Sequence, residues 1–250
     1  MKVVIVGDTP FVEEIGRLCQ QVNYDVGLHF QHDHFSAIRS GSLMFEVANA
    51  DIVIEAFNES FNKEQYLRNL GKSSPQTMLL TLALVTSTTL AASWVLHPER
   101  VVGFCVVPPI PLEGMVEVAK GLQTAESALT RATEFWQSLG QETVLVADGP
   151  GLIRARTVCC LINEAASALL EGVASAEDID LAMKLGTNYP HGPLEWADHI
   201  GLDAVLGVMT ALFEEWGEDR YRPSPLLKRM VLAGKLGKKT GEGFYEYGDR

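Results

Sequence analysis

The 250-residue sequence predicts an α/β protein in which a doubly wound parallel sheet is followed by an all-helical part. In the first half, short runs rich in Val, Ile and Leu alternate with amphipathic stretches, as expected for strands buried on both faces with helices between them. The segment Asp148-Gly149-Pro150-Gly151 interrupts this alternation, and apolar residues after it recur at helical spacing. We therefore predict two domains, residues 1–149 and 150–250.

The elements of the first domain follow from its apolar runs, each four to seven residues long, and from the amphipathic segments between them. Strands are expected over residues 3–6, 25–30, 52–56, 77–82, 101–107 and 143–147. Helices are expected over residues 11–22, 63–70 and 125–139.

The second domain is expected to open with a long helix that carries a small apolar face along Ile153, Thr157, Cys160 and Ala168. Ser175, followed by two acids, is typical of a helix N-cap. Further helices are expected over residues 176–185, 202–215 and 224–233, with stops at Gly186, Gly201, Gly217 and Gly234.

Composition excludes several classes of function. The formal net charge of −12, from 32 acidic and 20 basic residues, disfavours nucleic acid and anionic lipid as partners. No run approaches the ~18–20 apolar residues that span a bilayer, and the chain opens on a strand, which leaves no room for a signal peptide. The four cysteines show no CxxC spacing, so we expect reduced thiols, no metal site and a cytoplasmic location.

Ordered motifs in the second half carry a resemblance to a known family. They are Asp148–Ile153, Asn163–Ala165, Glu171–Ser175, Glu177–Asp180, Ala182–Gly186, Gly192–Glu195, Ala197–Asp198, Gly201–Asp203 and Ala233–Tyr245. Their order and spacing resemble the C-terminal domain of 3-hydroxyacyl-CoA dehydrogenases. The first half is similar in register at Asp51–Ala56 with Glu59, at Pro98–Gly103 and at Val116–Val118. About thirty residues that the family usually has after the second strand are missing.

The resemblance implies a Rossmann-like domain followed by a helical domain that dimerises, with NAD as the cofactor. Carried over by position, the cofactor-binding residues are Gly7, Asp8, Thr9, Phe30 and Glu59. The family's GxGxxG turn here keeps only its first glycine. The second glycine normally lets the backbone approach the pyrophosphate and the third allows close helix–strand packing. Their positions hold Thr9 and Val12.

Two further features weaken the expected NAD site. Phe30 stands where the family has an acid that binds the ribose. Asp8, Glu13 and Glu14 place negative charge at a helix start, where a pyrophosphate needs positive potential. We therefore expect NAD to bind weakly.

The catalytic positions that the resemblance implies are also altered. The family's histidine is Cys105, its serine is Leu84, and its two asparagines are Pro108 and Ala155. Glu117 remains at the position of the glutamate that orients the histidine. A carboxylate raises the pKa of a neighbouring thiol, so a cysteine beside this glutamate is a poor general base at neutral pH.

Three functional hypotheses remain open. The first is a homodimeric family member that is catalytically impaired or silent and binds an acyl-CoA or partners an active relative. The second is an NAD-dependent 3-hydroxyacyl-CoA (3-hydroxybutyryl-CoA) dehydrogenase of fatty-acid metabolism with an atypical active site. The third is an enzyme of altered chemistry that uses Cys105 or His191. The spacing of His29, His32 and His34 favours a solvated loop over a metal site.

Overall fold

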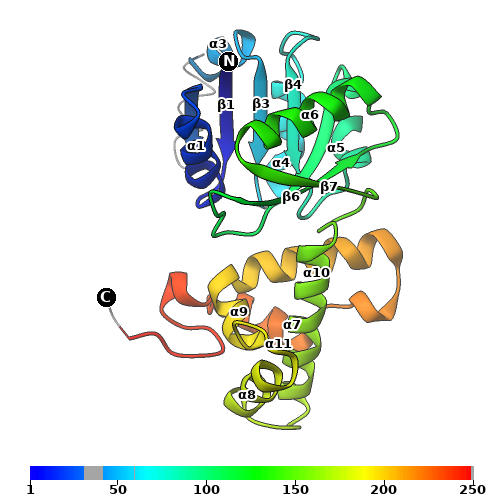
Figure 1. The fold of residues 1–250 in the computed structure, drawn as a ribbon. Helices are drawn as coiled ribbons and strands as arrows, with labels where there is room; N and C mark the ends of the chain where they lie inside the picture. The colour runs from blue at the N-terminus through cyan, green and yellow to red at the C-terminus, as the bar shows by residue number, and fades with distance from the viewer. Residues whose placement is uncertain (31–41, 59, 249–250) are drawn as a thin grey trace. The chain divides into compact units, whose positions relative to one another are not determined.

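The computed structural model describes residues 1–30, 42–58 and 60–248 (Figure 1). The chain divides into two compact units, Met1–Ile153 and Arg154–Arg250. The predicted domain boundary at 149/150 falls in the Gly-Pro-Gly segment just before this division.

The first unit contains a seven-stranded sheet in the order β2-β1-β3-β4-β5-β6-β7. Its strands are β1 Lys2–Gly7, β2 Asp25–Phe30, β3 Ile52–Ala56, β4 Met78–Leu82, β5 Val101–Cys105, β6 Gly114–Lys120 and β7 Gln141–Val146. All six strands predicted from the apolar pattern are present, and their ends agree within two residues.

The sheet departs from a wholly parallel arrangement at one place. β6 runs antiparallel to β5, whereas every other neighbouring pair is parallel. The connection from Cys105 to Gly114 is too short to hold a crossover helix, and parallel strands need such a crossover. The carboxyl end of β5 is therefore next to the amino-terminal half of β6.

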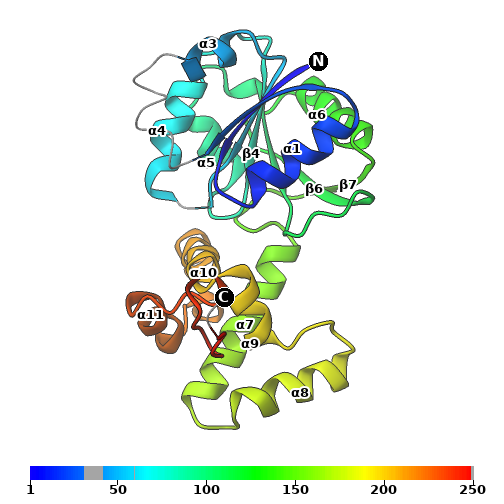
Figure 2. The ribbon, with the colours of Figure 1, turned by 90° about the vertical axis from the view of Figure 1, so that its left-hand side faces the viewer.

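Helices cover both faces of the sheet, as expected for a doubly wound fold (Figure 2). They are α1 Phe11–Gln21, α3 Ser42–Ala48, α4 Ser60–Leu70, α5 Thr88–Ser93 and α6 Glu126–Ser138, with a 3₁₀ turn at Pro98–Arg100. On one face, Val4, Val53 and Leu79 pack with apolar residues of α3, α4 and α5 in a buried cluster. Predicted helices 11–22, 63–70 and 125–139 are confirmed.

Two helices of the first unit, α3 and α5, were not predicted. α5 opens with Thr88 and Thr89, β-branched residues of modest helix propensity. Ser87 caps this helix, and the Asp148 carboxylate accepts the backbone N–H groups of Thr88 at 2.6 Å and Thr89 at 2.8 Å. Because Asp148 is sixty residues away in sequence, tertiary hydrogen bonding sets the start of α5.

The second unit is helical, as predicted. It contains α7 Arg154–Leu170, α8 Ala176–Thr187, α9 Pro193–Ile200, α10 Leu202–Trp216 and α11 Pro225–Leu232, with 3₁₀ turns at Asp219–Tyr221 and Lys238–Thr240. Ser175 caps α8 through the N–H of Asp178, as expected. Gly186 was wrongly expected to end this helix. Asn188, in the left-handed conformation at φ 57°, terminates it instead.

The small apolar face predicted on α7 is not packed inside the chain. Ile153, just before α7, is 51% exposed, Thr157 is exposed, and Cys160 is half-buried. The helix instead buries a different side, which includes Ala155, Cys159, Ile162 and Ala166.

Within the described residues, no single helix is long and apolar enough to cross a membrane. α9 and α10 meet that requirement only when taken together, and the pair is bent by 100°.

Candidate active site

The pair at the family's catalytic positions lies at the end of β5. Cys105 and Glu117 are register partners on the antiparallel strands β5 and β6. Partners in such a ladder have neighbouring side chains. Both residues are buried, with exposed fractions of 2% and 1%. The fold therefore places a thiol beside a carboxylate, where the resemblance implies an imidazole beside a carboxylate.

The Glu117 carboxylate also holds the hinge that precedes α7. One of its oxygens accepts the backbone N–H of Ile153 at 3.0 Å. This part-buried hydrogen bond ties the segment that leads into α7 to the sheet. Glu117 thus has a structural role that does not depend on proton transfer.

Apolar residues occupy the positions where the resemblance implies polar groups. Leu84, at the position of the family's serine, is buried, with an exposed fraction of 6%. Pro108, joined to Pro109 by a cis peptide bond, offers no N–H and no side-chain donor. Ala155 is buried in the first turn of α7, in the other unit. None of these side chains can donate a hydrogen bond to a developing oxyanion.

The retained glycine of the cofactor turn has a packing explanation. A Cβ built on Gly7 would lie 2.4 Å from both the carbonyl carbon and the carbonyl oxygen of Ala56. The ends of β1 and β3 therefore approach too closely for any side chain at this position. Gly7 is required by the sheet itself, whether or not a nucleotide binds.

The remainder of the turn is poorly suited to a pyrophosphate. Asp8 is 8% exposed, and its carboxylate accepts the Asn58 N–H at 2.8 Å. The residue at the N-cap of α1 is Pro10, which has no N–H to offer an anion. Glu13 and Glu14 occupy the first turn. An anion at this helix start would meet the negative charge of nearby carboxylates, so these residues do not fit the family's dinucleotide.

Helix α1 approaches the sheet closely at Gly16, one helical turn after the position of the family's third glycine. Val12, at the third glycine position, is fully buried. A Cβ on Gly16 would lie 2.7 Å from the Leu28 side chain on β2. Gly16, which the sequence analysis did not single out, therefore allows α1 to pack closely against the sheet.

Phe30 ends β2 directly beside Gly7, its register partner, and is half-buried. An aromatic ring at this position cannot accept hydrogen bonds from ribose hydroxyls as a carboxylate does. Glu59, the remaining cofactor position implied by the resemblance, lies outside the described residues.

Sequence reasoning missed a buried ion pair at the carboxyl edge of the sheet. Lys63 of α4 and Glu55 of β3 are both fully buried, with Nζ 2.5 Å from Oε2. Lys63 also donates to the Leu82 carbonyl at 2.9 Å, and Thr81 donates to the same Glu55 oxygen. Burial lowers the pKa of Lys63, and the Glu55 carboxylate opposes that shift. In the sequence, Lys63 is merely one polar residue of an amphipathic helix.

His191, the other candidate acid–base group, lies just before α9. Its Nδ1 is 3.5 Å from the Glu195 carboxylate, and its ring centroid is 4.7 Å from that of His199. It belongs to the helical unit, whereas Cys105 belongs to the first unit. All four cysteines are free thiols, and no cluster of three metal-ligating side chains occurs in the described parts of the chain.

Comparison with known proteins identifies both units. Residues 151–247 match the model of the 3-hydroxyacyl-CoA dehydrogenase C-terminal domain, and residues 14–149 match that of the corresponding NAD binding domain. The second match begins after the glycine turn at residues 7–12.

Individual relatives agree with these matches. The chain is 40% identical over 204 residues to a probable 3-hydroxybutyryl-CoA dehydrogenase of Deinococcus radiodurans, covering 81% of this chain and 73% of that one. It is 41% identical over 207 residues to its Bacillus subtilis counterpart, covering 82% and 72%. The crystal structure of (S)-3-hydroxybutyryl-CoA dehydrogenase from Ralstonia eutropha superposes with a TM-score of 0.83 at 31% identity, covering 99% of each chain.

We predict that Lys63→Met destabilises the first unit by about 3–5 kcal/mol, because Glu55 would be left as an uncompensated buried charge. Adding Glu55→Gln to this variant should recover part of the loss. Urea unfolding measures both effects. The matched control is Lys120→Met, which breaks the exposed pair with Glu126 and should cost less than about 1 kcal/mol. Equal losses of stability in Lys63→Met and in the control would contradict the conclusion that burial makes the Lys63–Glu55 pair costly to break.

We also predict an acid-dependent loss of stability in the helical unit. Burial lowers the pKa of His199 below its ordinary value of 6.5, and Lys238 and His191 act in the same direction, opposed by Glu195 and Asp198. The unfolded chain therefore binds the proton more tightly, so this contribution is present above pH 6.5 and is lost as the pH falls towards the folded pKa.

The measurement is the urea midpoint between neutral and mildly acidic pH. In His199→Gln the urea midpoint should fall less steeply with decreasing pH than in the unmodified chain. In His97→Gln, a substitution in the first unit, the slope should be unchanged. An unchanged slope in His199→Gln would show that another group causes the decline.

Proposed function

We propose a function for this chain from one premise: it belongs to the 3-hydroxyacyl-CoA dehydrogenase family. Within that family, we propose that it is a catalytically silent, homodimeric member that binds an acyl-CoA without oxidising it. The observation that carries the proposal is the pairing of Cys105 with Glu117. A buried thiol beside a carboxylate cannot replace the general base that the family's reaction requires.

Two other features of the site support the same function. The groups expected to hold the substrate carbonyl are Leu84, Pro108 and Ala155, none of which has a side-chain donor. The turn that should receive NAD carries Asp8, Thr9 and Pro10 in place of its donors and its second glycine. We therefore propose that NAD binds with millimolar affinity or more weakly, because hydrogen bonds to the pyrophosphate and the ribose normally contribute several kcal/mol together.

An active dehydrogenase is the second candidate. Its support is the identity of about 40% to proteins named 3-hydroxybutyryl-CoA dehydrogenase and the presence of Glu117. Glu117, however, accepts the Ile153 N–H. That structural use explains its presence without catalysis.

The homodimer is proposed from the surface of the helical unit. Of the residues in α8, only Asp180 is buried. Val173 and Leu185, beside and on this helix, are 70% and 79% exposed, and the α7 face at Thr157 is exposed as well. In Figure 2, α8 runs along the outer side of the helical unit. Apolar side chains exposed together at one site indicate a surface covered by another chain.

We predict negligible turnover of acetoacetyl-CoA with NADH, at least about 10²-fold below that of the Bacillus subtilis relative, because the general base and the carbonyl donors are both missing. Loss of NADH absorbance measures it. Cys105→His alone should not restore activity, since Leu84, Pro108 and the cofactor turn are unchanged. Turnover within about tenfold of that relative would establish the active dehydrogenase instead.

Calorimetry tests the two proposed binding properties, acyl-CoA binding and weak NAD binding, separately. Acetoacetyl-CoA should bind in the absence of NAD, and NADH should give no micromolar binding. Micromolar NADH binding would contradict the interpretation of the cofactor turn. Absence of acyl-CoA binding would leave a protein whose role lies in assembly alone.

We predict a particle of twice the 27.4 kDa chain mass in light scattering coupled to size exclusion at micromolar concentration. Val173→Lys combined with Leu185→Lys should give monomer, because two charges would be buried without partners. Leu232→Lys changes an 88% exposed residue of α11 and should leave the dimer intact. A monomeric unmodified chain would refute this prediction.

A further inference from the structure

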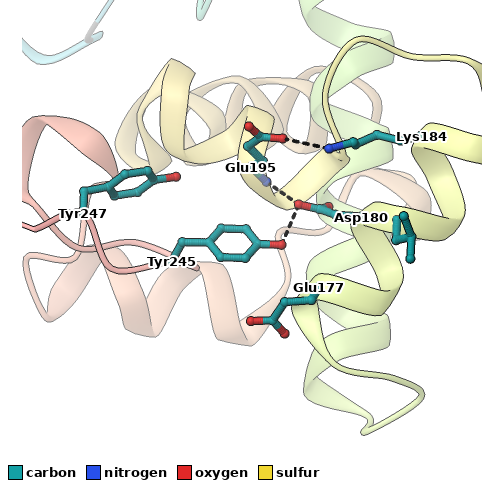
Figure 3. A pocket seen from close by; sticks show the side chains of 7 residues that line it. Glu177, Asp180, Lys184, Glu195, Tyr245 and Tyr247 are labelled. Atoms are coloured by element: carbon teal, nitrogen blue, oxygen red, sulfur yellow. Dashed lines mark hydrogen bonds and ion pairs between the residues drawn. The ribbon is translucent and has the colours of Figure 1, made fainter.

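A cavity of about 520 Å³ opens within the helical unit (Figure 3). Glu177, Leu181 and Lys184 line it from one side of α8. Glu195 of α9 and the rings of Tyr245 and Tyr247 in the C-terminal segment form the rest of its wall. Its size is in the range of small-ligand sites, about 300–1,000 Å³.

The wall of this cavity is held in place by two buried carboxylates. Asp180 accepts the N–H groups of Leu194 and Glu195 and the Tyr245 hydroxyl, each at 2.8 Å. Asp198 accepts the Tyr247 hydroxyl at 3.1 Å. A Cβ on Gly192 would lie 2.2 Å from Asp180, so the chain approaches this carboxylate as closely as glycine allows. The tyrosines are therefore preorganised, which lowers the entropic cost of binding.

The charges that line the cavity do not balance. Three carboxylates face one ammonium group. Lys184 lies 3.8 Å from Glu195, and Asp180 is engaged by its three donors. Glu177 has no ion-pair partner among the described residues, and Figure 3 shows its carboxylate on the opposite side of Asp180 from Lys184. Burial raises the pKa of both tyrosine hydroxyls, and nearby carboxylates add to the rise, so neither ring is charged.

We propose that this cavity binds a small cation on an apolar stem, an alkylguanidinium or alkylammonium. Its charged head pairs with Glu177, and its stem lies against Leu181 and the tyrosine rings, whose faces attract cations. The negative lining repels the phosphates of coenzyme A, so this site is separate from acyl-CoA binding and does not depend on the proposed function.

The test is a titration of the full chain with n-butylguanidinium chloride, followed by the amide NMR signals of Leu181, Tyr245 and Tyr247. These signals should shift saturably with a Kd of about 1 mM. Glu177→Gln should weaken binding at least about threefold, the size of one exposed ion pair. Glu177→Lys, which places a cation in the cavity, should abolish it. Glu171→Gln and Glu171→Lys make the same charge changes outside the cavity and should leave the Kd unchanged.

Sodium valerate, with a similar stem and the opposite charge, should shift none of these signals. The proposal is overturned if valerate binds equally well, if Glu171→Gln weakens binding as much as Glu177→Gln, or if no saturable shift occurs below about 10 mM probe.

Discussion

Buried and half-buried carboxylates that accept backbone N–H groups fix helix starts and hinges that the apolar core does not fix. Backbone donors at helix starts and in hinges have no partner in regular structure, and leaving them unpaired when buried is costly. Each such carboxylate joins segments far apart in the sequence. Asp148 starts α5, Glu117 holds the hinge, Asp180 starts α9, and Asp198 ties down the C-terminal segment.

This constraint separates what the fold needs from what catalysis needs. Gly7 is required by the approach of β1 to Ala56, Glu55 by its pair with Lys63, and Glu117 by the Ile153 N–H. Gly7 is the one glycine of the family's turn that this chain keeps, and Glu55 and Glu117 lie in segments where the chain resembles the family. Their presence is therefore explained by packing and hydrogen bonding. Leu84 and Cys105 are among the positions that differ from the family.

The strands could be predicted from sequence because burial on both faces produces apolar runs that few other structures give. The direction of β6, the start of α5 and the end of α8 could not, because they depend on a short connection, on Asp148 and on one left-handed Asn188. At the site, resemblance located Cys105 and Glu117, and strand pairing placed them together. Nothing local revealed that Lys63 would be buried or that Gly16 would allow α1 to pack closely.

Three of the altered positions share one feature, which is that each holds a side chain that packs in the core. Val12, Leu84 and Cys105 are buried at 0%, 6% and 2% exposure. Burying one aliphatic side chain contributes about 1.5–3 kcal/mol, whereas a buried polar group without a partner costs about 1–3 kcal/mol. Apolar side chains at these positions therefore stabilise the first unit by an amount comparable with a large share of a domain's net stability. In the silent member proposed above, this gain opposes the return of polar groups, because a single polar substitution would add the cost of an unpaired buried group without restoring the chemistry.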